Sequence, residues 1–154
     1  MAKHQDLIVF QKADELAYQI YKATEHFPKT EMYSLTSQIR RAALSIPTNI
    51  AEGYARKSKK ELSQFVSIAI GSHAETEYQL SFSKKLEFFK EDVSQIENLA
   101  AEVGKLLWSF YRSLRLLTAE FLHICTICRV PAFPLTIDVC TADLLLFISP
   151  HLRR

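Results

Sequence analysis

Four cations in five residues, Arg56-Lys57-Ser58-Lys59-Lys60, stand together at the start of an expected helix and could contact phosphate. Cations at a helix start are mildly disfavoured by the helix dipole, so local stability does not explain this run. A solvated turn without a ligand is the alternative interpretation. Arg40, Arg41 and the flanking Tyr54 could support a phosphate contact. The candidate nucleic-acid contacts are Arg40, Arg41, Arg56, Lys57, Lys59 and Lys60.

Acid–base chemistry could come from Glu75 and Glu77, with His73 four residues before the second glutamate. Residues two apart on a helix do not face each other, so the two glutamates are not expected to form a catalytic dyad. No base, nucleophile and oxyanion-stabilising group converge in the pattern, and we expect no enzymatic activity. An ion pair between Arg41 and Glu75, or simple exposure of these side chains, is expected instead.

Metal or redox chemistry could come from Cys125-Thr126-Ile127-Cys128, with Cys140 and either His123 or His151 completing four ligands. The later spacing is irregular, however, and a redox CxxC normally caps the start of a helix that follows a strand. Apolar packing of reduced thiols is the favoured interpretation. We therefore expect no metal and no cofactor.

The stretch Leu35–Gly53 carries polar residues in steps of four, three and four, which place them on one helix face. These residues are Arg41, Ser45, Thr48 and Glu52. Pro47 lies inside the helical pattern and removes one backbone hydrogen bond, so a bend is expected there. Asn49 and Ser45 are close enough to satisfy backbone groups near the proline. Local hydrogen bonding is therefore the favoured interpretation of this face.

Four amphipathic segments must position these residues, because apolar residues recur with the period of a helix along each of them. They span about 6–26, 30–52, 58–89 and 92–117. Phe27-Pro28 ends the first segment, and Gly53 is expected to cap the second in a left-handed conformation. Ser58 and Glu61 have the spacing of a capping box at the third. Short polar loops between the segments predict an all-α, antiparallel up-down-up-down four-helix bundle.

The composition changes sharply near Thr118. Residues 119–154 hold all three cysteines, three of the five prolines and no glycine. We therefore expect a bundle over 5–118 and an atypical C-terminal extension over 119–154, first continuing the last helix through Ala119–Cys128 and then irregular. Two alternatives stay open for the extension: it packs on the bundle, or it is an adventitious tail that adds no stability. Phe88 and Trp108 lie off the apolar stripes and are candidates for a subunit interface.

The overall composition limits the classes of function. A chain of 154 residues is typical of one domain, and 48% hydrophobic with 23% charged residues argues against disorder. A net charge of +2 does not indicate a strongly basic protein, so any nucleic-acid contact must be local. No apolar run reaches the roughly 18 residues of a membrane span, and the N-terminus lacks the apolar core of a secretory signal. A cytoplasmic protein without a membrane partner is expected.

The segment QIRRAALSIPTNIAEGYARKSKKEL, followed by FVSIAIGSHAETEYQL, resembles the 23S rRNA intervening-sequence-encoded proteins, also called the four-helix-bundle protein family. The opening DLIVFQKADELAYQIY resembles the start of the same family, so the resemblance covers about residues 5–118. It implies a small cytosolic bacterial protein whose relatives form ring-like homopentamers and have no established enzymatic activity. The chain is also similar to the accessory protein of diversity-generating retroelements, a basic pentamer that binds a reverse transcriptase and nucleic acid.

The resemblance assigns structural motif positions but transfers no catalytic role. These positions are Gln38, Ser45, Pro47, Asn49, Glu52, Gly53, Gly71, Ser72 and Glu75. We expect a non-enzymatic homo-oligomer, a pentamer by resemblance, that binds RNA or a ribonucleoprotein and has no small-molecule substrate. The alternative is a structural or protein-interaction scaffold with no nucleic-acid role.

Overall fold

The computed structural model describes residues 4–123, with side chains for residues 4–115. This range forms four α-helices: α1 (Ile8–Ala23), α2 (Leu35–Ala55), α3 (Lys59–Lys85) and α4 (Ser94–His123). Three short 3-10 turns precede α1 or lie between α1 and α2, at His4–Asp6, Thr24–His26 and Lys29–Glu31. Residues 4–123 contain no β-strand, so the predicted all-α class is confirmed.

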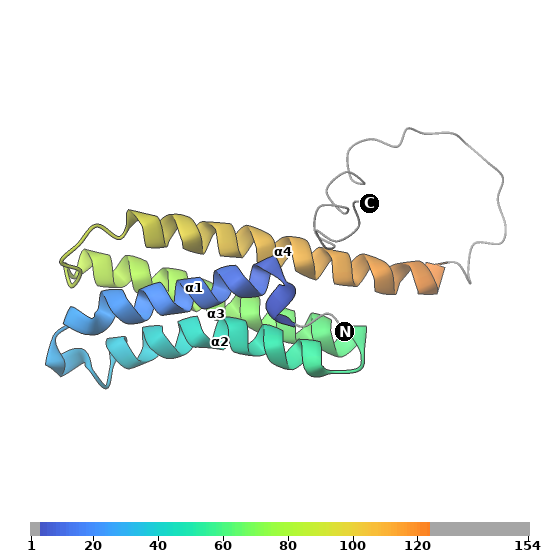
Figure 1. Cartoon of the computed structure of the whole chain (residues 1–154), viewed down its shortest axis with the longest axis horizontal. Coiled ribbons are helices and arrows are strands. Elements are labelled where there is room, and N and C mark those ends of the chain that lie inside the picture. Colours follow the sequence, from blue (N-terminus) through green and yellow to red (C-terminus); the bar gives the residue numbers. More distant parts are fainter. Residues whose placement is uncertain (1–3, 124–154) are drawn as a thin grey trace.

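The four helices form one bundle. In Figure 1 the chain runs along α1 from right to left, returns along α2, and repeats this course along α3 and α4. Both α1 and α3 pack against α2 and α4, so each helix has two neighbours. The apolar stripes that periodicity predicts are therefore covered by packing against one another.

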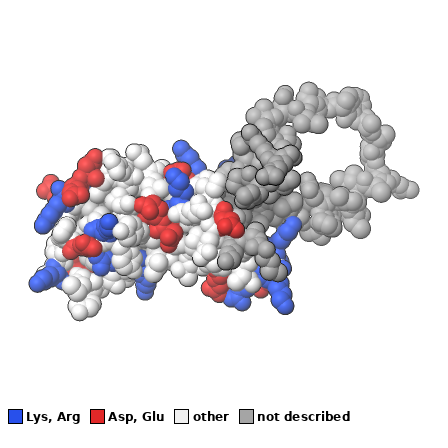
Figure 2. Space-filling view, in the orientation of Figure 1, with Lys and Arg blue, Asp and Glu red and all other residues white. Residues whose placement is uncertain are grey.

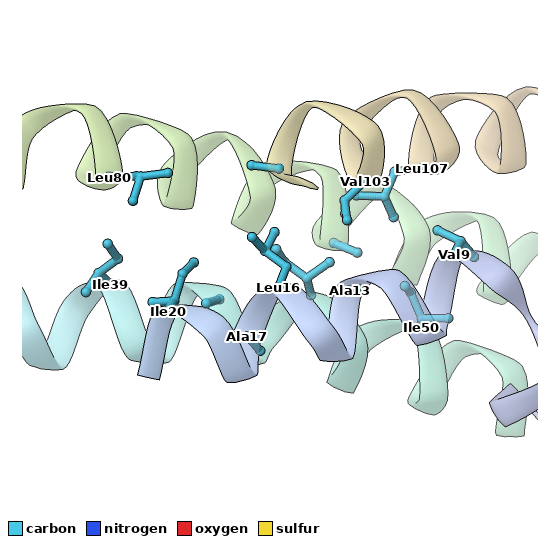
Figure 3. Close-up of a cluster of buried hydrophobic side chains, with 14 residues drawn as sticks. Val9, Ala13, Leu16, Ala17, Ile20, Ile39, Ile50, Leu80, Val103 and Leu107 are labelled. Carbon is cyan, nitrogen blue, oxygen red and sulfur yellow. The ribbon is translucent and has the colours of Figure 1, made fainter. Parts of the chain in front are cut away.

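Small and branched apolar side chains from all four helices fill the core. Figure 3 shows Leu16 and Ile20 pointing from α1 into the space between the helices, with Val103 and Leu107 reaching in from α4. The buried cluster comprises Val9, Ala13, Leu16, Ala17, Ile20, Ile39, Ala43, Ile46, Ile50, Ala69, Leu80, Ala100, Val103 and Leu107. The many alanines bring the helix backbones close together, which fixes the spacing of the surfaces outside.

The first helical stretch ends where the sequence predicts, whereas the second helix begins a few residues later than predicted. The residue before Pro28, Phe27, is extended, and this stops the first helical stretch where the sequence predicts. The helix α2 begins at Leu35 rather than near Thr30 because residues 29–31 form a 3-10 turn. In that turn the Glu31 N–H donates to the Pro28 carbonyl and the Met32 N–H to the Lys29 carbonyl. This tighter pattern rarely extends beyond a few residues.

The helix α3 ends at Lys85 rather than near Phe89 because Glu87 adopts a φ of 56°, in the left-handed region. The Phe88 N–H donates to the Ser83 carbonyl and the Glu87 N–H to the Lys84 carbonyl. These two bonds form a Schellman motif, which normally has glycine at the left-handed position. Because this position holds glutamate and not glycine, the sequence did not predict the end of the helix here.

The start of α4 lies close to its predicted position. The Asp92 carboxylate accepts hydrogen bonds from the Ser94 backbone N–H at 3.0 Å and from the Ser94 hydroxyl at 2.6 Å. The hydroxyl bond first, and then the backbone bond, lower the pKa of Asp92. The carboxylate thereby satisfies one of the N–H groups that a helix start leaves without an internal partner.

Gly53 does not have the role that its position suggests. It lies inside α2 with no positive φ, and the helix ends at the cap residue Arg56, so the predicted left-handed glycine cap is wrong. A Cβ atom at Gly53 would lie 2.7 Å from the Phe65 Cβ atom and 3.1 Å from the Leu62 Cδ1 atom of α3. Glycine is needed at this position for the close approach of two helices.

Gly71→Ala is expected to raise the free energy of unfolding by about 0.5–1 kcal/mol, because a Cβ there meets open space and glycine weakens a helix interior. Gly53→Ala makes the same chemical change against α3 and is expected to destabilise the protein. Urea titrations of both variants at one protein concentration measure the difference. A Gly71→Ala variant that is less stable and lower in assembled mass would contradict the open environment of Gly71.

The predicted division at Thr118 falls inside α4, which continues to His123. The predictions for Cys125–Cys128, Cys140, His151 and the apolar extension lie outside the described residues. Within the described part of the chain, no group of three or more His, Cys, Asp or Glu residues is placed to hold a metal ion. The helices described here also fall short of the length and apolar character that a membrane span requires.

Candidate functional site

A chain of polar side chains joins α2 to α3 at the motif positions. The Asn49 side-chain amide donates to the Ser45 carbonyl at 2.7 Å and to the Ser45 hydroxyl at 2.9 Å. The Ser45 hydroxyl lies 2.9 Å from the Ser72 hydroxyl, which donates to the Ile68 carbonyl at 3.2 Å. Each hydroxyl can therefore accept one hydrogen bond and donate another. Because all the bonds then run in one direction, from the Asn49 amide to the Ile68 carbonyl, each bond strengthens its neighbours. The predicted local bonding beside Pro47 is confirmed, while the bend itself stays a prediction.

The other polar motif residues bond within their own helices. Arg41 donates to the Gln38 side-chain oxygen at 2.8 Å, and Glu75 accepts from the Gln79 side chain at 3.0 Å. Arg41 and Glu75 are both exposed, so of the two expectations exposure is correct and the Arg41–Glu75 ion pair is wrong. An intrahelical partner is nearer to each side chain than the neighbouring helix, which explains the outcome.

His73 is a packing residue that the sequence interpretation missed. It is buried in α3, and its Nε2–H donates to the Ala100 carbonyl of α4 at 2.7 Å. Its Nδ1 atom lies 3.6 Å from a Glu77 carboxylate oxygen. A Cβ at Gly104 would lie 2.8 Å from the imidazole Cε1 atom, so the ring fills the notch that this glycine leaves. The ring therefore fastens α3 to α4.

The basic run of the sequence forms a surface that we call the basic corner, consisting of Arg56, Lys57, Lys59 and Lys60. Arg56 caps α2, and Lys59 and Lys60 open α3. Figure 2 shows blue side chains gathered at the lower right, at the end where Figure 1 places the α2–α3 connection. Arg56 pairs with Glu52 at 2.5 Å and stacks over the Phe65 ring at 5.1 Å. One of the four cations is thus anchored within the chain.

The three lysines of the basic corner differ from Arg56. Each is exposed, and no described residue forms an ion pair or hydrogen bond with any of them. Ser58 is the N-cap residue of α3, as the predicted capping box requires. Its side chain nevertheless makes no capping hydrogen bond. Three charged amines therefore lie close together at the positive end of a helix dipole, and Glu61 in the first turn of α3 forms no ion pair with any of them.

Arg40 and Arg41 do not join the basic corner. They lie near the start of α2 and Arg56 at its end, about 22 Å apart at the helical rise per residue. Arg40 is half-buried and donates to the Thr24 hydroxyl at 2.7 Å and to the Tyr21 carbonyl at 3.3 Å. Its guanidinium also stacks over the Tyr21 ring. Arg40 therefore anchors the end of α1, and Arg41 is the more accessible of the pair.

A groove of about 640 Å³, which we call the α2 groove, lies around Arg41. It is lined by Tyr21 of α1, by Met32 and Tyr33 before α2, and by residues of α2 between Thr36 and Thr48. Sequence reasoning singled out Arg40, Arg41, Ser45 and Thr48 among its lining residues, but not the aromatic wall. The lining residues come from separate elements, so no local spacing could reveal them together.

The aromatic residues off the core stripes have different environments. Phe88 packs edge-on against Phe27 at 5.6 Å between ring centroids, so it has a partner within the chain. Trp108 is 50% exposed and contacts Tyr111 at 5.9 Å. On α3, Tyr78 and Phe82 stack at 6.1 Å, and both are exposed. Exposed apolar side chains therefore occur on all four helices, and those of α3 and α4 include Tyr78, Phe82 and Trp108.

A model of the 23S rRNA-intervening sequence protein family matches residues 5–109, more than half of the chain. The chain belongs to this family. Both the basic corner and the α2 groove lie within the part of the chain that matches the 23S rRNA-intervening sequence proteins.

A solved structure also resembles this 23S rRNA-intervening sequence protein. It is the crystal structure of a protein of unknown function from the S23 ribosomal protein family of Bacteroides thetaiotaomicron. The two chains are 30% identical with a TM-score of 0.60, and the match covers 68% of this chain and 98% of the other. No curated protein matches the chain. Neither the family match nor the structural match indicates a catalytic reaction.

Proposed function

We propose that this protein is a non-enzymatic, homo-oligomeric RNA-binding module of the cytoplasm, with the basic corner as its RNA contact. The observation that carries the proposal is the set of three unpaired lysines at the start of α3. Mutual repulsion and the helix dipole both disfavour three cations there. A phosphate backbone would remove both penalties, because it supplies negative charge at the spacing of successive nucleotides.

The proposed assembly would strengthen a weak contact of this kind. The resemblance implies a pentameric ring, and the exposed apolar residues of α3 and α4 supply surface for contacts between subunits. These residues are Ile68, Tyr78, Phe82 and Trp108. Several copies of the basic corner on one ring would bind one RNA with a high effective concentration. A modest cluster in each chain then suffices for useful affinity.

Replacing Lys57, Lys59 and Lys60 together by Gln is expected to weaken binding of labelled ribosomal RNA fragments at low salt. The slope of log affinity against log salt should become shallower by about 2–3, since each lost phosphate contact removes about 0.7–0.9 from it. Fluorescence anisotropy at a series of salt concentrations measures the slope. The matched control replaces Lys29, Lys90 and Lys105, which are exposed elsewhere and change the net charge equally.

The scaffold alternative predicts a different result. A scaffold would keep its assembled mass in light scattering but would bind no RNA at low salt. Equal loss of slope in the test and control variants would show that affinity follows net charge and not the basic corner. A monomeric protein in light scattering would contradict the assembly.

A further inference from the structure

The α2 groove has the charge of an anion-binding surface. Arg40 and Arg41 line it, and no Asp or Glu is among its described lining residues. Arg41 is exposed, and its guanidinium donates a hydrogen bond to the Gln38 side-chain oxygen at 2.8 Å. A guanidinium held in this way is pre-organised for a ligand oxygen, so less conformational freedom is lost on binding.

Two hydroxyl-bearing residues of the groove lining, Thr36 and Ser37, form no side-chain hydrogen bond within the described part of the chain. Thr36 is 6% exposed, and its Oγ1 atom is buried without a hydrogen-bond partner. A buried hydroxyl without a partner is uncommon and unfavourable, and this one belongs to a residue that lines the groove. Ser37 adds an exposed hydroxyl to the same lining. A ligand with its own hydroxyl groups would bond the exposed Ser37 hydroxyl, whereas the buried Thr36 Oγ1 atom is out of its reach.

The apolar part of the groove is aromatic. Tyr33 is 92% exposed, and its ring rises from the connection between α1 and α2. Met32 and Tyr21 lie beside it in the lining. A nearly bare aromatic ring beside an arginine is the pattern with which proteins stack unpaired bases and hold the neighbouring phosphate.

We propose that the α2 groove seats one nucleotide of a single-stranded RNA, with its base stacked on the Tyr33 ring and its phosphate bonded to the Arg41 guanidinium. The exposed Ser37 hydroxyl is the polar group of the lining that bonds the sugar. This inference rests on the proposed RNA-binding function and gives it a preference for unpaired strands. The volume of about 640 Å³ lies within the range of pockets that hold small organic ligands. The basic corner then holds the backbone of the same strand about 22 Å away along α2.

The test uses the full chain and a short fluorescein-labelled oligoribonucleotide, measured by anisotropy as a single strand and as its duplex. Tyr33→Ala should weaken single-strand binding roughly 5- to 150-fold, the effect of losing one stacked base. Tyr33→Phe should retain that affinity, because the ring remains. Duplex binding should not change in either variant, since paired bases cannot stack on the ring.

Arg41→Gln should lower the slope of log affinity against log salt by about 0.7 for the single strand. The matched controls are Tyr18→Ala and Lys105→Gln, which remove another exposed tyrosine and another exposed cation that do not line the groove. Both controls should bind the strand like the parent protein. Circular dichroism and light scattering on every variant establish that fold and mass are unchanged.

Three results would overturn the inference, and they separate it from the proposed function. Equal single-strand affinity for Tyr33→Ala and Tyr18→Ala, with salt dependence still reduced by the triple lysine variant, would reject the groove and keep the basic corner. A lower assembled mass for Tyr33→Ala would assign the groove to a protein partner. A parent protein that binds neither strand nor duplex at low salt would reject both proposals.

Discussion

Leu16→Ala is expected to lower the free energy of unfolding by about 2–5 kcal/mol. Leu16 is 0% exposed and lies at the centre of the buried cluster, where all four helices contribute side chains. The loss combines the transfer free energy of the removed carbons with the cavity that remains. Close-packed alanines around the site limit collapse of that cavity, so the upper half of the range is expected. Urea unfolding followed by circular dichroism measures the change.

Leu44→Ala is the matched control for this substitution. Leu44 is 47% exposed on the outer side of α2, so the same atoms are removed from a site already in contact with water. A change within about 0.5 kcal/mol is expected, as for ordinary surface substitutions. Both variants must be compared at one protein concentration, because the proposed assembly would add to apparent stability. Equal losses in the two variants would show that Leu44 is buried in the assembled protein.

Gly104→Ala is expected to lower the free energy of unfolding by about 1–3 kcal/mol, although alanine is the better helix former. The new Cβ atom would lie 2.8 Å from the Cε1 atom of His73. The ring cannot move away easily, because it is buried and its Nε2–H is bonded to the Ala100 carbonyl. Thermal and urea unfolding measure the loss, and the exposed Gly71→Ala serves as the control of opposite sign.

A double-mutant cycle with His73→Ala tests this cause directly. Removing the imidazole leaves a cavity and an unpaired Ala100 carbonyl, so His73→Ala alone is also destabilising. In the double variant the Gly104→Ala methyl group enters space that the ring has left. The combined loss should therefore be smaller than the sum of the two single losses by about 1 kcal/mol or more. Additive losses would mean that the clash does not cause the Gly104→Ala effect.

The helices could be predicted from sequence because their apolar residues recur with a strong period. Ile39, Ile46 and Ile50 follow one another at seven and four residues along α2, a helical spacing, and all three lie in the core. The core position of His73 was missed, although His73 lies on the buried stripe of α3. It follows Ala69 by four residues and precedes Thr76 by three. A histidine four residues from a glutamate suggests acid–base chemistry, but the buried position of His73 makes it a packing residue.

The surfaces could be predicted only in part. The basic corner is contiguous in sequence, so a local count of charges finds it. The α2 groove depends on how α1 ends and how residues 29–34 turn before α2, and no local rule gives that arrangement. Gly53 was misassigned for a similar reason, because a glycine near a helix end fits a cap and a close contact equally well until the neighbouring helix is known.

The connection between α2 and α3 is the shortest between any two helices of the described chain, with only residues 56–58 separating them. Pairing of these helices therefore closes a small loop and loses the least chain entropy, so we expect this hairpin to form early in folding. The hydrogen bonds from Asn49 through Ser45 and Ser72 then set the register of the two helices. During synthesis, the lysines of the basic corner would take their places at the turn before α4 has left the ribosome.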